Sequence, residues 1–118
     1  MGLGNFKKVI AGVTSVENLM IRPTFSEAFD IFGKRWTGLI LATLISGPLH
    51  FKEILDAMPQ LNESMLSKRL KELIVEDMVT RTVYPETPVR IEYSLTDKGH
   101  ALYDVLREVH EWADVWME

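Results

Sequence analysis

The stretch FKEILDAMPQLNESMLSKRLKELIVEDMVTRTVYPETPVRIEYSL, residues 51–95, decides the fold. Apolar residues at positions 51, 54, 55 and 58 follow helical spacing and predict a first helix over residues 51–58, which Pro59 ends. A second helix is predicted over residues 62–76. Asn62 is its expected N-cap, because an Asn side chain can accept a free backbone N–H of the first turn.

The second predicted helix has two distinct faces. Its inner stripe is formed by Leu66, Leu70, Leu73 and Ile74. On the opposite side, within an arc of about 100° and each within about 60° of Ser64, lie Ser64, Ser67, Lys68 and Lys71. Short hydroxyl side chains let a helix approach base edges in the major groove, while lysines neutralise phosphates. An ordinary solvent-exposed helix face fits these four residues equally well, so the face alone does not decide the function.

A β-hairpin is predicted directly after this helix. Residues 79–84 and 90–95 are rich in β-branched and aromatic side chains, which favours two antiparallel strands. Pro85 and Pro88 stiffen the connection, so the tip should project as a wing. Arg90 could reach a phosphate or the minor groove, although Glu86 works against this. A purely structural hairpin is the alternative, but the order helix, turn, helix, hairpin predicts a winged helix-turn-helix of the α+β class, mainly α.

Several short motifs accompany this order: Gly33-Lys34-Arg35-Trp36, Leu39-Ile40-Leu41, Gly47-Pro48-Leu49-His50-Phe51, residues 65–73, residues 81–86, residues 92–96 and Gly99. Together they resemble the HxlR-type winged helix-turn-helix regulators, over about residues 25–116. The most specific part is the wing, where VYPE returns to EYSLT. The resemblance implies a bacterial or archaeal transcription regulator that binds DNA as a homodimer. In that arrangement the second helix, residues 62–76, enters the major groove and the wing, residues 79–95, lies beside it.

The candidate DNA-binding residues are polar or basic and lie on the second helix, on the wing or near them: Asn62, Ser64, Ser67, Lys68, Lys71, Lys34, Arg35, Lys52, Arg81 and Arg90. The net charge of −4 has to be reconciled with this assignment. Residues 97–118 contain six acids and two basic residues, and the rest of the chain holds 11 of each sign. The acidity is therefore confined to the C-terminal region. A modest basic footprint predicts weak nonspecific binding that salt removes readily.

The C-terminal region predicts one amphipathic helix after Thr96, its expected N-cap. One stripe of this helix is apolar and is the candidate dimer interface: Leu102, Val105, Leu106, Val109, Trp112 and Trp116. Two tryptophans near the end of a small domain are costly to leave in water, and a partner subunit would cover them. Packing against the chain's own N-terminal helix is the competing interpretation.

Upstream, Phe25, Ala28, Phe29 and Phe32 form another helical stripe that should end at Gly33. Residues 35–46 are apolar nearly all round and predict a buried central helix. Residues 1–24 are expected to form an N-terminal arm that adds to the dimer interface or is partly mobile, and residues 25–118 to form the DNA-binding domain with its dimerisation helix. Phe6, Val9, Ile10 and Val13 keep helical spacing within the arm, but its glycines weaken a helix.

The absence of cysteine excludes disulfides, thiolate metal sites and cysteine catalysis. Redox-sensing members of the resembled family place a cysteine just before the first conserved helix. Here that neighbourhood is Arg22-Pro23-Thr24, so thiol sensing is not expected. The chain has no apolar run of transmembrane length and no signal-type segment, which predicts a soluble, cytoplasmic protein.

Other chemistries have weak support. His100 with Asp104 and His110 with Asp114 have the i, i+4 spacing of metal ligands on one helix, but exposed polar pairs explain them better, and neither a metal nor another cofactor is expected. No catalytic motif is evident, so an enzyme is not expected. The sequence leaves room for a small-molecule effector of unidentified chemistry between the central helix and the dimer helices, where no convergent polar set marks a pocket.

Two hypotheses from different classes remain. The first is a sequence-specific regulator that binds a palindromic operator as a homodimer. The second is a winged-helix module for protein contacts, in which the outer face of the second helix meets an acidic protein surface.

Overall fold

The computed structural model describes residues 22–118, so the predicted stripe of Phe6, Val9, Ile10 and Val13 lies outside the described residues. The chain consists of two compact units, and the boundary between them lies between Lys34 and Arg35. In the first unit, helix α3 (Pro23–Phe32) confirms the predicted phenylalanine stripe, with ring centroids 5.1 Å apart for Phe25 and Phe29. It ends at Gly33, as expected, although that residue keeps a right-handed backbone.

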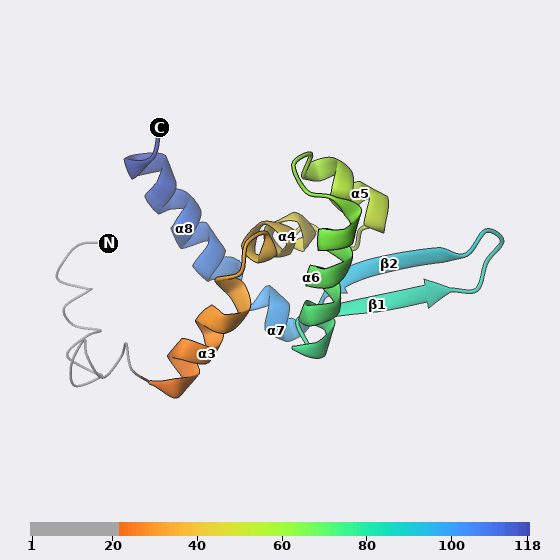
Figure 1. Ribbon diagram of the computed structural model, residues 1–118, viewed down its shortest axis with the longest axis horizontal. Coiled ribbons are helices and arrows are strands. Elements are labelled where there is room, and N and C mark those ends of the chain that lie inside the picture. The colour runs from red at the N-terminus through yellow and green to blue at the C-terminus, as the bar shows by residue number, and fades with distance from the viewer. Residues whose placement is uncertain (1–21) are drawn as a thin grey trace. The chain divides into compact units, whose positions relative to one another are not determined.

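The second unit has the element order of a winged helix-turn-helix (Figure 1). Its elements are α4 (Thr37–Leu44), α5 (Phe51–Ala57), α6 (Glu63–Val75), β1 (Val79–Tyr84), β2 (Arg90–Leu95), α7 (Asp97–His100) and α8 (Tyr103–Trp116). Fully buried aliphatic side chains from α4, α5, α6 and β1 form the core: Ile40, Leu41, Leu44, Ile54, Leu66, Leu70, Leu73 and Val79. Burial of each stabilises the fold by about 1.5–3 kcal/mol. The predicted α+β, mainly α class is confirmed.

Helix α4 is shorter and less enclosed than the sequence predicts for residues 35–46. It starts after Trp36, whose backbone is left-handed with φ of 80° and so cannot continue a right-handed helix. Leu39 keeps 58% of its surface exposed, while Ile40 and Leu41 are fully buried. The prediction that this helix is buried all round is therefore wrong for one of its faces.

Helix α6 is fixed at both ends. The Asn62 side chain accepts the Met65 backbone N–H at 2.8 Å, which confirms the predicted N-cap. At the other end Asp77 adopts the left-handed conformation, with φ of 59°. The Asp77 N–H then donates to the Ile74 carbonyl and the Met78 N–H donates to the Leu73 carbonyl, at 3.0 and 2.9 Å. This pair of hydrogen bonds is a Schellman motif, and it turns the chain directly into β1.

The predicted hairpin is confirmed, and it is tied to the helices at its base. β1 and β2 pair antiparallel from Val79 opposite Leu95 to Tyr84 opposite Arg90. Leu49, just before α5, forms an isolated antiparallel bridge with Tyr93 through hydrogen bonds of 2.9 and 2.8 Å. The tip extends away from α5 and α6 (Figure 1).

The C-terminal region forms two helices, so the prediction of one helix after Thr96 is wrong. Thr96 does cap α7, accepting the Gly99 N–H at 3.1 Å. The Thr96 hydroxyl also donates to the Asp77 carbonyl, and the Lys98 ammonium donates to the Glu76 carbonyl, both at 2.7 Å. These bonds dock α7 against the end of α6, and the chain changes direction before α8 begins at Tyr103. No helix within residues 22–118 has the length and apolarity needed to cross a membrane.

Candidate nucleic-acid interface

The outer face of α6 carries the predicted recognition residues. Ser64, Lys68 and Lys71 are exposed and Ser67 is half-buried, whereas the inner leucines at positions 66, 70 and 73 are at most 1% exposed. Because both ends of α6 are capped, this polar face is presented by a helix with a fixed start and end. It has the chemistry to meet phosphates and base edges.

One further residue on this face escaped the sequence analysis. Val75, in the last turn of α6, is 82% exposed. At 100° per residue it lies within about 20° of Ser64 and four residues beyond Lys71. The same spacing that grouped the serines and lysines could have found it. An exposed valine methyl can contact a thymine methyl group.

Arg69 holds α6 against the segment before α4. Its Nε donates to the Arg35 carbonyl at 2.9 Å, and its Nη1 lies 3.0 Å from a Glu72 carboxylate oxygen. The side chain is only 13% exposed, so it supports the helix rather than meeting solvent. No local pattern marks this contact, because 34 residues separate Arg69 from Arg35.

The two basic residues before α4 differ in placement. Arg35 belongs to the second unit, and its guanidinium carbon lies 4.6 Å from the centre of the Trp36 ring. Its carbonyl contact with Arg69 places its backbone beside α6. Lys34 is exposed and ends the first unit, so its predicted DNA contact stays a prediction.

Arg90 is enclosed by acids on the wing itself. Its guanidinium lies 3.0 Å from a Glu86 oxygen and 2.8 Å from a Glu92 oxygen, and it stacks over the Tyr84 ring at 3.8 Å. The hydrogen bonds that Arg90 donates to Glu86, followed by the charges of both glutamates, raise the pKa of Arg90 above its ordinary value. Its positive charge is therefore compensated within the hairpin.

The other wing cation, Arg81, lies on the opposite face. In the β1–β2 register Arg81 pairs with Tyr93, whereas Arg90 pairs with Tyr84. Side chains alternate between the two faces of a strand, so these two arginines are not brought together. Lys52, Glu86 and Arg90 line one groove of about 480 Å³ between the start of α5 and the wing tip, and Arg81 is not among its lining residues.

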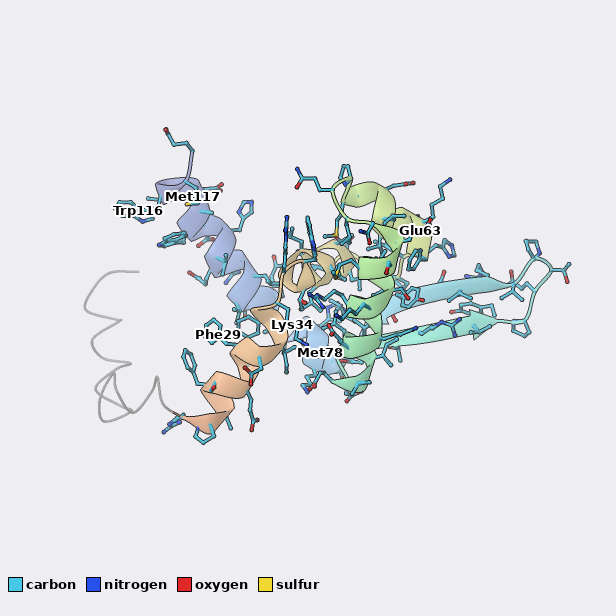
Figure 2. All side chains as sticks on the ribbon, viewed as in Figure 1. Phe29, Lys34, Glu63, Met78, Trp116 and Met117 are labelled. Atoms are coloured by element: carbon cyan, nitrogen blue, oxygen red, sulfur yellow. The ribbon has the colours of Figure 1, made fainter. Side chains whose placement is uncertain are left out.

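Most of the predicted interface residues lie exposed on helix α8, and Leu102 immediately precedes it. Trp112 and Trp116 are 58% and 71% exposed, Val105 and Val109 are exposed, and Leu102 and Leu106 are half-buried. Figure 2 shows Trp116 and Met117 at the free end of the helix. Across α8 no residue is buried, so its apolar stripe lacks the cover that the inner face of α6 has.

The histidine pairs do not assemble into a ligand cluster. His100 ends α7 and Asp104 lies in α8, so they do not share a helix. His110 Nδ1 lies 3.4 Å from an Asp114 oxygen, and both side chains are exposed. Among residues 22–118 no three His, Cys, Asp or Glu side chains are grouped as a metal site.

The HxlR-like helix-turn-helix family matches residues 31–118. The chain belongs to this family. YvaP of Bacillus subtilis, an uncharacterised HTH-type transcriptional regulator, is 53% identical over 81% of this chain and 89% of its own length. The HTH-type transcriptional regulator YodB of the same organism is 48% identical over 81% and 86%. The reduced form of YodB superposes with a TM-score of 0.75 over 84% of this chain and 97% of the YodB chain.

The superposition on reduced YodB agrees with the element order and the winged-helix geometry. The protein is therefore an HxlR-type helix-turn-helix transcriptional regulator, and the family that the sequence motifs indicated is confirmed. The relatives named here are regulators, not enzymes.

Proposed function

We propose that this HxlR-family chain binds a specific duplex sequence with α6 in the major groove and the β1–β2 wing alongside. The observation that carries the proposal is the exposed face of α6, where Ser64, Ser67, Lys68 and Lys71 stand opposite a fully buried leucine stripe. A helix held this way can present hydroxyls to base edges while its two lysines meet flanking phosphates.

The wing contributes less charge than its sequence implies. Glu86 and Glu92 compensate Arg90, so the hairpin tip is not a strong minor-groove cation. Arg81, Lys52 and Arg35 are exposed and are the further candidates for phosphate contacts beside α6 within the second unit, and Lys34 of the first unit stays a candidate. Base selectivity would then come chiefly from α6, and the wing would orient the protein on the backbone.

The proposed complex is a homodimer formed through α8. Its exposed stripe ends in two tryptophans, and such surfaces on soluble proteins mark interaction sites. A two-fold dimer would set two α6 helices about 34 Å apart, one turn of the duplex, and would favour a palindromic operator.

The acidic residues do not oppose this arrangement. Residues 97–118 carry the whole of the net charge of −4. Helix α8 and the wing tip lie at opposite ends of the second unit along the long axis of the view (Figure 1). Charges separated by more than about 8–10 Å are largely screened at physiological salt, so the acids of α8 would act little on phosphate contacts at the wing tip.

The test of the proposal is selection of bound duplexes from a random pool by the intact protein. A specific dimer should enrich a palindromic sequence with half-sites one helical turn apart. Recovery of a pool with no enriched sequence would contradict specific DNA binding. It would favour the second candidate, a protein-contact module whose α6 face meets an acidic partner.

The recognition face is tested by replacing its lysines. Lys68→Ala and Lys71→Ala should each weaken binding to all duplexes and lower the slope of log affinity against log salt by about one. Arg107→Ala is the control, since it removes one positive charge from α8, where the side chain pairs with Asp104 at 3.5 Å. Ser64→Ala or Ser67→Ala should instead change the enriched sequence. If the double lysine variant binds like Arg107→Ala, α6 does not contact the duplex.

A further inference from the structure

A second concave surface lies away from the outer face of α6. It is formed by α4 and by the end of α5 with the turn that follows, and it encloses about 550 Å³. Its walls include Trp36, Leu39 and Thr43 from the α4 side, and Met58, Pro59 and Gln60 from the α5 side. This volume falls within the range of about 300–1,000 Å³ typical of small-molecule pockets.

The lining defines which ligands fit. None of the described residues that line the groove is ionisable, and the neighbouring Arg35 guanidinium lies over the ring of Trp36. A charged ligand would therefore lose hydration without gaining a counter-ion among the lining residues. Leu39 is 58% exposed there, which leaves a large apolar side chain for a ligand to cover. The Thr43 hydroxyl already donates to the Leu39 carbonyl at 2.8 Å, so it and the Gln60 amide offer only a small number of hydrogen-bonding positions.

Trp36 favours an aromatic ligand. Its backbone is held at φ of 80°, a conformation that bulky residues rarely adopt and that persists where the surroundings enforce it. The Arg35 guanidinium lies 4.6 Å from the ring centre and covers one face of the indole. The rest of the ring borders the groove, where a flat aromatic molecule could pack by offset stacking or edge-to-face contact.

The groove also adjoins the supports of α6. Pro59 and Gln60 lie just before Leu61 and the Asn62 cap. On the other side, the residue preceding Trp36 accepts the hydrogen bond from Arg69 of α6 through its carbonyl. A molecule seated between these two segments would contact both the turn before α6 and the backbone to which α6 is bonded.

We propose that this groove binds a small, uncharged aromatic molecule, and that occupancy changes the contact between Arg35 and α6. Any consequence of this changed contact for DNA recognition rests on the function proposed above, whereas binding of the ligand to the groove does not. The test therefore contains no DNA, and its failure would be distinguishable from failure of duplex binding.

The probe is 2-naphthol, titrated into the intact protein while the three tryptophan indole N–H resonances and the Arg69 Nε–H resonance are followed by NMR. Saturable shifts are expected at Trp36 and Arg69. Trp112 and Trp116 serve as internal controls, because both lie on the apolar stripe of α8. Shifts confined to Trp112 and Trp116 would overturn the proposal, as would the absence of saturable shifts. A Trp36 shift without an Arg69 shift would overturn the link to α6.

Two matched comparisons define the chemistry. The anion 2-naphthoate should bind at least about tenfold more weakly than 2-naphthol, because no lining residue is charged and the Arg35 guanidinium is already stacked over the Trp36 ring. Leu39→Gln should weaken 2-naphthol binding at least about fivefold, whereas Val89→Gln, at a 60% exposed valine of the wing loop, should not. Equal binding of the two probes, or of the two variants, would contradict the proposal. A loss of dimer in sedimentation of Leu39→Gln would assign the groove to a second copy of the chain instead.

Discussion

Helices α6 and α8 are similar in length and amphipathic, yet they differ in what covers their apolar faces. In α6 the apolar stripe of Leu66, Leu70 and Leu73 is fully buried within the unit, and the polar face is left for solvent. In α8 no residue is buried, and the apolar stripe itself is open. The apolar face of the first helix is thus covered within one chain, whereas the second presents an exposed apolar stripe that the proposed dimer would cover.

This difference separates stability from assembly. Substitutions on the inner face of α6 should act on the folding of one chain, since its contacts are intramolecular. Substitutions on the stripe of α8 should act mainly on association. Substitutions on the outer face of α6 should affect neither folding nor association, so this face could vary with the duplex sequence in the proposed complex.

The largest expected effect is at the inner face of α6. Leu70→Ala should lower the free energy of unfolding by about 2–5 kcal/mol, because it leaves a cavity at a residue that is 1% exposed. Val109→Ala, at a 58% exposed position of α8, should change it by about 0.5 kcal/mol or less at concentrations where the protein is monomeric. Urea unfolding measures both. Equal losses of unfolding free energy in the two variants would contradict the difference in burial between α6 and α8.

The next effect is expected on association. Trp116→Ala should weaken the proposed dimer by about 2–4 kcal/mol, as truncation of an interface tryptophan does at many interfaces. Glu108→Ala, elsewhere on α8, is the control. Sedimentation velocity over a concentration series measures the shift toward monomer. A variant that stays dimeric would show that Trp116 lies outside the interface.

A smaller effect on stability is expected where α7 packs against the end of α6. A Cβ at Gly99 would collide with the Met78 backbone carbonyl, so Gly99→Ala should destabilise the fold by about 1–3 kcal/mol. Gly38→Ala is the matched control, because no atom lies within 4 Å of a Cβ placed there and alanine favours helix. Thermal unfolding should place the melting temperatures of these variants on opposite sides of the parent value. A neutral Gly99→Ala would mean that α7 is not held closely beneath the end of α6.

The smallest effect is expected at the wing. Glu86→Gln removes the carboxylate that lies 3.0 Å from Arg90, so that more of the positive charge of Arg90 can reach phosphates. Binding to random duplexes should tighten by less than about threefold, with a salt slope steeper by at most about one. Glu108→Gln makes the same charge change on α8 and should do less. If the affinity for random duplexes rises equally in both variants, the effect comes from net charge alone and the wing does not contact the duplex.

Local sequence signals predicted α5, α6 and the hairpin to within one or two residues. The first and last residues of these elements are set by local features of the sequence, namely helical spacing, the Asn62 cap and the prolines of the turn and the loop. The polar face of α6 followed from the same spacing. The roles of these side chains toward DNA stay predictions, since they concern a partner and not the chain.

Contacts between distant residues could not be predicted in this way. The Leu49–Tyr93 bridge and the Arg69–Arg35 hydrogen bond join residues 44 and 34 positions apart, and neither leaves a periodic pattern. The break between α7 and α8 falls at Ala101 and Leu102, residues that favour helix. Tertiary bonds from Thr96 and Lys98 to the end of α6 set the direction of α7 there, and local propensity does not.

Only residues 76–78 separate α6 from β1, and backbone and side-chain hydrogen bonds hold this link on both sides. The helix and the hairpin therefore have no hinge between them. In the proposed complex they would meet the duplex as one rigid body, and any mismatch in groove width would have to be relieved by bending or twisting the DNA. The stiffness of base steps that the protein never touches would then contribute to operator choice.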